Sequence, residues 1–376
     1  MGTDFQGKGT MSRFVVSAST GSYPVFVQSD VPGIKEIPEH LFANDGRIIL
    51  ITDERVAGFH GATIEKHLVG LGFHPVVLTV PAGERAKKPN TVIRLCREML
   101  QHGAQRGTPV CGFGGGVVGD IAGFVASIYM RGVPLLHIPT TLLAQVDSSV
   151  GGKTGVDLPE GKNLIGTFWA PSFVWSCTSF LSSLPARRVR EGLSEALKYG
   201  YIARPDLLDR CLQIPPRSPN EDPDRLSNFV FDCISVKADV VTKDEHEKGL
   251  REILNFGHTI GHGIERIMGY RKITHGEAVA IGMVAELALG EVLGVSPKGI
   301  AQDASERLSR IGLPTMIPSG IDAQTLVEAV SHDKKNVGKK RTIITISTPG
   351  TPERIQLTDR ELLKNLNLAQ CAVINR

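Results

Sequence analysis

The sequence predicts an α/β protein of two domains, with a parallel sheet in the first half and a mostly helical second half. Three observations support this prediction. The chain has 376 residues, which is more than a single hydrophobic core usually serves. Up to about Leu184, short β-branched or apolar runs alternate with longer helix-compatible segments, as in βαβ units. Beyond that point long amphipathic segments take over, which favours helices.

The elements of each half follow from local patterns. Strands are predicted where β-branched and apolar residues run together, and the helices between them would carry the chain back across the sheet. In the first half we expect strands at 47–52, 75–80 and 108–113, and helices at 62–72 and 90–102. In the second half we expect helices at 185–202, 224–244, 250–268 and 275–293, with a Pro-, Ser- and Asn-rich surface loop at 215–224.

The composition excludes several classes of protein. Hydrophobic residues make up 41% and charged residues 22%, which are ordinary globular values, and the net charge is only +3. Such a small charge argues against nucleic acid or an anionic membrane as the main partner. The longest apolar stretch, residues 278–295, contains Glu286 and Glu291, so it predicts a buried helix and no membrane span.

The cysteines indicate a reducing compartment. The six are scattered through the chain and form no Cys-x-x-Cys pair, which argues against a disulfide framework and against a thiolate zinc site. We therefore expect a cytoplasmic protein. The cysteines are Cys96, Cys111, Cys177, Cys211, Cys233 and Cys371.

The first ten residues differ from the rest of the chain. They contain Gly2, Gly7 and Gly9 ahead of a second methionine, Met11, and they lack a hydrophobic signal region. We expect a disordered leader or an added segment at residues 1–10. The first domain is then predicted at 11–184 and the second at 185–376.

A glycine cluster provides the first chemical signal. Residues 112–120 include five glycines, directly after a predicted strand and at the start of a helix. Glycines let the backbone approach a pyrophosphate, and a helix N-terminus offers free amides to an anion. A tight turn packed on a sheet would use the same residues, so the cluster alone leaves both interpretations open. Asp53 ends the first strand and could bind a ribose hydroxyl, but it lies upstream of the glycines, unlike the usual dinucleotide fingerprint.

A second run suits an anion. Residues 147–157 place Lys153 among glycines, and Lys162 with Asn163 follow closely. An ammonium group surrounded by backbone amides can hold a phosphate or a carboxylate. The run is not a Walker A motif, because the four-residue spacer between glycines is missing. The loop at 81–87 adds Glu84 and Lys87 to the same predicted sheet edge, although by itself it could be a solvated loop.

The second half contains metal-type ligands. His258 and His262 are four residues apart, so a helix would set both imidazoles on one face, with Arg251 and Asn255 near the same surface. Ordinary core histidines would be the simpler interpretation of such a pair. Glu195 and Lys198 share a helical face, and a surface ion pair is the simpler interpretation there. Taken together with the other lysines and with His275, however, the inventory suits a small, multiply anionic substrate beside a metal.

These motifs, in this order, resemble the 3-dehydroquinate synthase family of the sugar phosphate cyclases, which is related in fold to the iron-dependent alcohol dehydrogenases. The resemblance runs from about Ile49 into the C-terminal region. It implies an N-terminal Rossmann-like NAD-binding domain followed by a mostly α-helical metal- and substrate-binding domain. The matching blocks are residues 114–120, 131–132, 139–147, 148–163, 195–200, 244–251 and 275–279.

The resemblance implies ligands for each position that matches. Zinc, for which Co²⁺ could substitute, would bind Glu195, His258 and His275. NAD would bind Asp53, Glu84, Lys87, Gly115, Gly116, Val117, Asp120, Thr140, Thr141 and Lys162, with Phe180, Leu181, Ser182 and Ser183 near the adenine. The substrate would bind Arg131, Asp147, Lys153, Asn163, Lys198, Lys237, Arg251, Asn255, His262 and one of Lys334 and Lys335. The catalytic groups would be Glu247 and His262 as proton acceptors, with Lys153, Lys198 and Arg251.

The implied activity converts 3-deoxy-D-arabino-heptulosonate 7-phosphate to 3-dehydroquinate and phosphate, a step of the shikimate pathway to the aromatic amino acids. The implied course is transient oxidation by NAD, phosphate elimination, reduction, ring opening and aldol closure. The resemblance also implies a homodimer.

Several alternative functions stay open. An aminodehydroquinate synthase or another sugar phosphate cyclase would share most of the motifs. A metal-dependent glycerol-type dehydrogenase would share the fold, NAD and the metal ligands, but its substrate gives no reason for the cations. A non-catalytic NAD-binding protein would not need the complete set of ligands and lysines.

Overall fold

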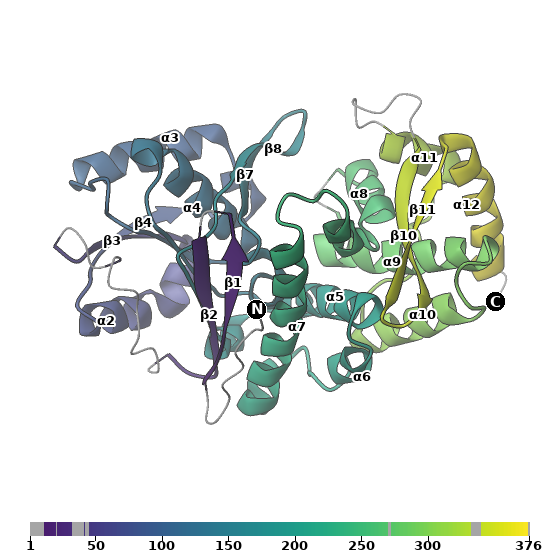
Figure 1. The fold of residues 1–376 in the computed structure, drawn as a ribbon, viewed down its shortest axis with the longest axis horizontal. Coiled ribbons are helices and arrows are strands. Elements are labelled where there is room, and N and C mark those ends of the chain that lie inside the picture. The colour runs from purple at the N-terminus through teal and green to yellow at the C-terminus, as the bar shows by residue number, and fades with distance from the viewer. Residues whose placement is uncertain are drawn as a thin grey trace. The chain divides into compact units, whose positions relative to one another are not determined.

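The chain folds into two compact units, coloured along the sequence in Figure 1. The computed structural model describes residues 11–19, 21–31, 41, 45–269, 272–331 and 340–374. The first unit comprises Met1–Pro185 and Ser218–Glu245, and the second comprises Ala186–Arg217 and His246–Arg376. The expected leader at 1–10 and the candidate residues Lys334 and Lys335 lie outside the described residues.

The expectation that residues 185–376 form one domain is wrong for one segment. The helix α7 (Pro223–Lys243) belongs to the first unit, where it packs on the strands β1 (Met11–Ala18) and β2 (Gly21–Gln28). Phe231 of α7 meets Phe14 of β1 edge to face, with 5.5 Å between ring centroids. A hydrophobic stripe predicts that a helix is amphipathic, but it does not say which core the stripe covers.

A seven-stranded sheet forms the centre of the first unit. Its order is β1-β2-β9-β6-β5-β3-β4; β1 and β2 are antiparallel, and all other neighbours are parallel. The predicted strands correspond to β3, β4 and β5, whereas the other four strands had not been predicted. The remaining bounds are β3 Arg47–Asp53, β4 His74–Val80, β5 Val110–Gly114, β6 Leu135–Pro139 and β9 Phe173–Cys177.

Both faces of this sheet are covered. Along β3, Ile49 and Ile51 enter a core that includes side chains of α3 and α4, and Ile48 and Leu50 enter a second core that includes side chains of α2. This alternation is the two-residue period of a strand buried on both sides. The crossover helices are α2 (Ala62–Gly70), α3 (Pro89–Gln101) and α4 (Gly116–Ile128).

A separate hairpin of β7 (Lys153–Leu158) and β8 (Gly161–Phe168) packs on α4 through β7. Gly123 permits this contact, because a Cβ atom there would lie 2.4 Å from Thr154 Cγ2. The hairpin therefore carries the predicted anion-binding residues of β7 and β8 on a fixed support. Shorter elements of the first unit are α1 Glu54–Val56, η2 Ala57–Gly61, η3 Glu84–Ala86, η4 Tyr129–Arg131, η5 Ala144–Ser148, η6 Thr178–Ser183 and η7 Pro219–Glu221.

The second unit is mostly helical and is built around α9. Its helices are α5 Ala186–Ile202, α6 Asp206–Cys211, η8 Leu250–Asn255, α8 His258–Ile267, α9 His275–Val292, α10 Ile300–Ile311, α11 Ala323–Ser331 and α12 Asp359–Ile374. The expectation that strands stop near Leu184 is wrong, because β10 (Arg341–Thr348) and β11 (Thr351–Leu357) form a hairpin whose first strand packs on α9. Its β-branched residues are a strand signal.

The predicted helix at 250–268 is broken in the middle. Gly257 adopts a left-handed conformation with φ of +79°, so the 3₁₀ helix η8 ends at Asn255 and α8 begins at His258. Arg251 and Asn255 therefore do not share a helix with His258, contrary to the expectation. Only a residue without a Cβ adopts this backbone readily.

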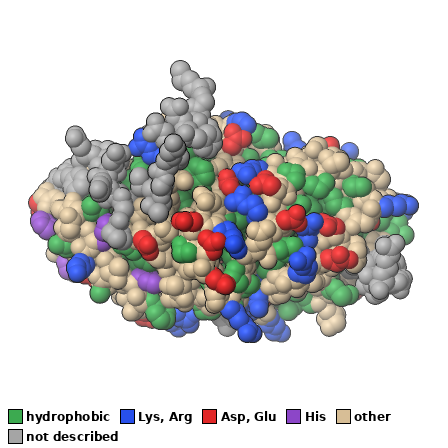
Figure 2. Space-filling model, turned by 90° about the horizontal axis from the view of Figure 1, so that it is seen from below, with side chains coloured by type: hydrophobic (Ala, Val, Ile, Leu, Met, Phe, Trp, Pro, Cys, Tyr) green, Lys and Arg blue, Asp and Glu red, His purple; other side chains and the backbone are tan. Residues whose placement is uncertain are grey.

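Two surface observations bear on possible partners. Among the described residues, no helix has both the length and the apolar character that crossing a membrane requires. Figure 2 shows one face of the protein, on which Lys and Arg side chains lie among Asp and Glu side chains. The described side chains on that face thus form no continuous basic surface of the kind that tracks a nucleic acid backbone.

Candidate metal centre and cofactor site

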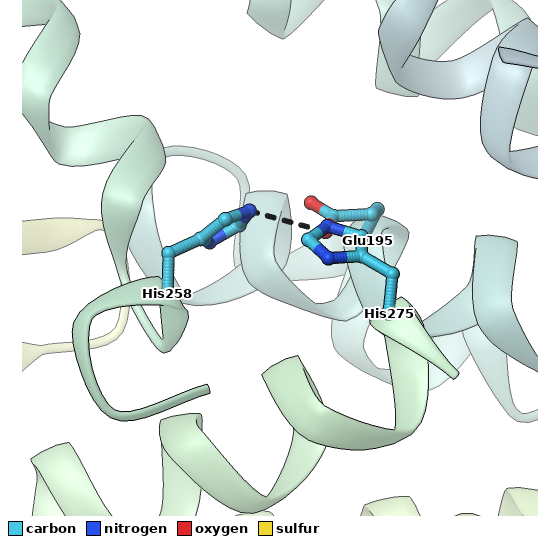
Figure 3. A group of neighbouring side chains, drawn as sticks. All are labelled: Glu195, His258 and His275. Carbon is cyan, nitrogen blue, oxygen red and sulfur yellow. Dashed lines mark ion pairs between the residues drawn. The ribbon is translucent and has the colours of Figure 1, made fainter. Parts of the chain in front are cut away.

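Three predicted metal ligands converge within the second unit (Figure 3). Glu195 comes from the middle of α5, while His258 and His275 are the first residues of α8 and α9. Glu195 Oε1 lies 3.5 Å from His258 Nε2 and 3.4 Å from His275 Nε2. Sequence alone had suggested these residues only through the family resemblance; the structure puts them side by side.

These separations fit a shared metal ion better than hydrogen bonds. An N–H···O hydrogen bond spans about 2.7–3.2 Å. Two ligands that each lie about 2.1 Å from a tetrahedral ion are themselves about 3.4 Å apart. In addition, neither Glu195 oxygen accepts a well-aligned hydrogen bond from the described residues, although charged nitrogen atoms surround it. Two imidazoles and one carboxylate thus form a donor set suited to zinc, with positions left for substrate oxygens.

The Glu195 carboxylate is completely buried, which sets the electrostatics of the centre. Burial would raise its pKa, but the charges of Lys198, His258 and His275 outweigh burial and hold the pKa well below its usual value. Lys198 Nζ lies 2.5 Å from Glu195 Oε2, and its side chain is 2% exposed. The surface ion pair considered for these two residues is therefore excluded.

Each proposed imidazole ligand is oriented through its other ring nitrogen. His258 Nδ1 lies 3.2 Å from the backbone oxygen of Phe256, and His275 Nδ1 lies 3.3 Å from Glu265 Oε2. Such acceptors keep Nδ1 protonated and leave Nε2 free for a metal. Sequence analysis missed Glu265. It lies seven residues after His258 on the same helix, and a carboxylate on the buried side of an amphipathic helix could have indicated it.

His262 lies beside the three proposed ligands, with its ring centroid 5.3 Å from that of His258, but it is much more exposed. Its side chain is 61% exposed, and its Nε2 lies 3.9 Å from Glu265 Oε2. It can form a second group with Glu265 and His275, but that group shares His275 with the first. Of the two histidines that lie four residues apart, His258 is thus a candidate ligand, whereas His262 has an accessible imidazole.

The other candidates of the second unit lie near the start of α8. Arg251, on η8, is 2% exposed, so its charge is held in the interior. Asn255 donates a hydrogen bond of 2.8 Å from Nδ2 to Glu247 Oε1. Glu247 itself has a left-handed backbone with φ of +57°, an uncommon conformation that is often found at functional sites.

Thr274 and Glu277 determine where α9 begins. The two residues form a reciprocal capping box, so the helix starts at His275. Arg187 of α5 donates two hydrogen bonds to Glu277, from Nε at 2.8 Å and from Nη2 at 2.7 Å. The helix that carries Glu195 is thereby tied to the start of the helix that carries His275.

The cofactor candidates of the first unit gather at the carboxyl ends of the parallel strands, which form one side of the sheet. The parallel strands all end at this edge, and the chain leaves β3 toward β4 on one side and returns as β5 on the other. Such a reversal of strand order is where open α/β sheets bind nucleotides. Asp53 ends β3, and Gly115 follows β5 as the N-cap of α4. Asp53 Oδ1 accepts hydrogen bonds from Arg55 and Val56, so this carboxylate also caps a helix.

The glycine loop is packed too closely for side chains at Gly115 and Gly116, so only backbone is present there. A Cβ atom on Gly115 would lie 2.9 Å from Thr141 Cγ2, and one on Gly116 would lie 3.0 Å from Ser148 Oγ. Gly115 offers no side chain to cap α4, so the first amides of the helix stay free of such a cap. Thr140 Oγ1 is buried and has no hydrogen-bond partner among the described residues. These features fit the phosphate part of NAD.

Charged candidates form a network beside the loop. Lys87 is buried, pairs with Asp120 Oδ2 at 2.6 Å and donates to Asn163 Oδ1. Burial would lower the pKa of Lys87, but the carboxylates of Asp120, Glu84 and Asp157 raise it, so the lysine stays charged. Lys162 Nζ lies 3.7 Å from Glu84 Oε1. The interpretation of residues 81–87 as a simple solvated loop therefore does not hold, because Lys87 is buried and ion-paired.

The remaining candidates of the first unit are less tightly grouped. Lys237 of α7 forms an ion pair of 2.9 Å with Asp147 Oδ1 and also donates to the Asp147 backbone oxygen. Arg131 is exposed, with a left-handed φ of +69°, and Lys153 is exposed at the start of β7.

The predicted adenine segment, which comprises Phe180, Leu181, Ser182 and Ser183, lies on η6. Phe180 and Leu181 are buried, while Ser182 is exposed. His60, which sequence analysis did not consider, lies 2.6 Å from Ser183 Oγ through Nε2. His60 follows Asp53 closely in sequence, but nothing in the sequence indicates this contact.

A parallel sheet with a glycine loop at its reversal point, and a separate helical unit with a His₂Glu centre, define a nucleotide- and metal-dependent α/β enzyme. Residues 77–191 match the 3-dehydroquinate synthase N-terminal family, and residues 192–336 match the 3-dehydroquinate synthase C-terminal family. A 3-dehydroquinate synthase of Thermodesulfovibrio yellowstonii is 40% identical over 360 residues, which cover 95% of this chain and all of that protein. The chain belongs to the 3-dehydroquinate synthase family.

Solved structures of related cyclases share the fold. A 2-deoxy-scyllo-inosose synthase, crystallised with carbaglucose-6-phosphate, NAD⁺ and Co²⁺, matches with a TM-score of 0.82 and 28% identity, over 94% of this chain and 99% of that one. A 2-epi-5-epi-valiolone synthase of Streptomyces hygroscopicus with NAD⁺ and Zn²⁺ matches with a TM-score of 0.79 and 25% identity, over 90% and 99%. The predicted fold class is thus confirmed.

The geometry of the metal centre makes a direct prediction. Replacing Glu195→Gln should weaken zinc binding by more than about 100-fold, because even indirect partners of a metal site change affinity by 10–100-fold. Competition with a chromophoric chelator measures this affinity. Glu191→Gln is the matched control, since Glu191 is buried one turn earlier on α5 and pairs with Arg188 at 2.7 Å. Equal zinc affinity in the two variants would contradict the assignment.

Proposed function

We propose that this chain converts 3-deoxy-D-arabino-heptulosonate 7-phosphate to 3-dehydroquinate and phosphate, with NAD bound in the first unit and zinc in the second. Membership of the 3-dehydroquinate synthase family supports the reaction. The reversal point of the sheet and its glycine loop support NAD. The spacing of Glu195, His258 and His275 supports the metal.

The buried cations beside the metal centre are the observation on which this proposal chiefly rests. Lys198 and Arg251 are each 2% exposed, and Lys198 directly contacts the ligand Glu195. Burying an ammonium or guanidinium group is expensive unless an anion compensates it. Glu195 compensates Lys198 within the protein. The proposed substrate carries a phosphate and a carboxylate, which a cluster of lysine and arginine side chains is suited to bind. A neutral polyol, the substrate of a glycerol-type dehydrogenase, has no anion for them.

NAD, zinc and the protein side chains have different parts in the proposed reaction. When bound, NAD supplies a reversible oxidation of a substrate hydroxyl, and zinc acts as a Lewis acid that eases loss of the hydroxyl proton. Lys198 and Arg251 would hold substrate anions in fixed positions and would stabilise negative charge as phosphate leaves. The substrate-binding candidates of the first unit are Lys153, Asn163 and Lys237.

Proton transfer is assigned to the two residues that the family resemblance implies. Asn255 donates to Glu247 Oε1 and so orients this carboxylate, a group of the kind that accepts protons in catalysis. His262 is accessible to solvent through most of its side chain, as a group that exchanges protons with water must be. Neither role depends on a movement of the metal ligands.

The related cyclases support the substrate class. The 2-deoxy-scyllo-inosose synthase structure holds a sugar phosphate analogue together with NAD⁺ and a divalent metal. The 2-epi-5-epi-valiolone synthase structure holds NAD⁺ and Zn²⁺. A sugar phosphate substrate, NAD and zinc, which Co²⁺ could replace, are therefore proposed for this chain.

Assembly and location are proposed from the family resemblance and from the cysteines. A homodimer follows from the family resemblance, and sedimentation equilibrium at the mass of a single chain would overturn it. A cytoplasmic location fits the cysteines, since Cys96, Cys111, Cys177, Cys211 and Cys233 carry free thiols, as expected in a reducing compartment. Cell fractionation tests that location.

The reaction itself is the main test. With the heptulosonate phosphate, catalytic NAD and zinc, we expect phosphate and dehydroquinate in equal amounts and no accumulation of NADH. A phosphate assay, a coupled dehydroquinase and the NADH absorbance follow the three products. Chelation of the metal should abolish turnover. Net NADH formation from a polyol would instead indicate a dehydrogenase, and turnover of only the amino-substituted substrate would indicate an aminodehydroquinate synthase.

Lys237 provides a test of the cation assignments. Lys237→Met should lower kcat/KM by about 100- to 1000-fold, the usual effect of removing one preorganised charge from an active site. Lys243→Met is the matched control on the same helix, because Lys243 is 57% exposed and pairs with Asp239 one turn away. Steady-state kinetics of both variants decide the point. A kcat/KM unchanged in Lys237→Met would leave this lysine a purely structural role.

A further inference from the structure

The reaction described above gives no role to the fully buried carboxyl group of Glu286. Glu286 lies near the middle of α9, is 0% exposed and is surrounded by apolar residues of the second unit. Burial raises its pKa to about 8, against the opposing effect of the Gly257, Ile260 and Thr259 amides. A buried carboxyl group costs free energy unless its oxygens are hydrogen-bonded. The partners of this group should therefore explain its presence.

Glu286 caps the N-terminus of α8. Its Oε2 accepts a hydrogen bond of 2.7 Å from the Gly257 amide, and its Oε1 accepts one of 3.2 Å from the Ile260 amide. The first amides of a helix lack partners within that helix, and Gly257, as its N-cap, has no side chain to supply one. A residue of a different helix thus does the work of an N-cap for the helix that begins with His258.

The Gly257 amide also connects Glu286 to His258. The N–H of Gly257 and the C=O of Phe256 belong to one planar peptide group and point in opposite directions. Glu286 binds the N–H, and the Phe256 oxygen lies 3.2 Å from His258 Nδ1. A carboxyl oxygen that accepts from the N–H polarises the peptide group and makes its oxygen a better acceptor.

Close packing holds the backbone around Gly257 in place. A Cβ atom on Gly282, one turn before Glu286, would lie 1.9 Å from the Gly257 oxygen. A Cβ atom on Gly257 would lie 2.6 Å from Met283 Cγ. The backbone leading into α8 is therefore pressed against α9.

The two histidine ligands are supported in parallel ways. His275 Nδ1 faces the buried carboxylate of Glu265 directly. His258 Nδ1 faces a peptide oxygen, behind which stands the buried carboxylate of Glu286. Carboxylates behind metal-bound imidazoles fix the ring and increase its basicity.

We propose that Glu286 is a positioning residue for the metal centre, which acts through the 256–257 peptide group to orient His258 and strengthen its binding to the metal. This inference rests on the proposed zinc site. Glu286 does not touch the metal, the substrate or the cofactor in this scheme.

Glu286→Gln is the direct test, because glutamine has the same shape but replaces one accepting oxygen with an NH₂ group that would face a backbone N–H. We expect the zinc dissociation constant to rise about 10- to 100-fold, as for other indirect partners of a metal site. Chelator competition measures the constant. The visible spectrum of the Co²⁺-loaded protein should also shift, whereas kcat at saturating zinc should change much less than the affinity.

Glu291→Gln is the matched control. Glu291 is also on α9 and accepts a hydrogen bond of 2.8 Å from the Ala301 amide near the start of α10, a helix without proposed ligands. This variant loses a comparable bond, so its thermal stability should fall while its zinc affinity and Co²⁺ spectrum stay those of the unmodified chain. If Glu286→Gln does not fold, Glu286→Asp, which keeps the carboxyl group on a shorter side chain, takes its place in the same measurements.

The outcomes separate this inference from the proposed function. Zinc affinity unchanged in the Glu286 variant, with affinity lost in Glu195→Gln, overturns the role of Glu286 and leaves the metal site intact. Equal weakening in the Glu286 and Glu291 variants also overturns it, since general loss of helix stability would then be the cause. Unchanged affinity in Glu195→Gln overturns the metal site itself.

Discussion

The second unit depends on the fully buried charge of Glu195. An isolated carboxylate in a protein interior would take up a proton or destabilise the fold, and an ion pair repays the loss of water only with good geometry. Here Lys198 compensates one oxygen, and the other faces two imidazole nitrogens at distances that suit a shared ion. The three helices α5, α8 and α9 must therefore meet at one point. Their caps and glycines are the means by which they do so.

The first unit depends on a different constraint, which is backbone access to an anion. The reversal of strand order next to β3 brings a glycine loop and the Asp53 carboxylate to the same sheet edge, and side chains at Gly115 or Gly116 would close the loop. The charges nearby are paired within the protein, as Lys87 is with Asp120. The phosphate contacts proposed for NAD thus rest mainly on amides, whereas the cations keep the edge electrically balanced.

Sequence patterns predicted the features that are local, and missed those that arise between distant segments. Apolar β-branched runs gave β3, β4 and β5, and the predicted helix at 275–293 is α9. The helix predicted at 250–268 is wrong because a single left-handed glycine outweighs the helical periodicity around it. The attachment of α7 to the first unit, and the contact of Glu265 with His275, depend on tertiary packing that periodicity does not record. The three metal ligands were inferred only because the chain resembles a known family.

The helix α9 shows why a buried helix can carry functional information in residues that look structural. Its first residue is the proposed ligand His275, its third is the capping Glu277 tied to α5, and its interior contains Gly282 and Glu286, both of which contact the backbone that precedes His258. One helix thus presents one ligand and sets the place of another. Glu286 first argued against a membrane span, because a carboxylate interrupts the apolar stretch. Its two hydrogen bonds supply the reason that this interruption can be accommodated: the carboxyl group is buried where helix amides need an acceptor.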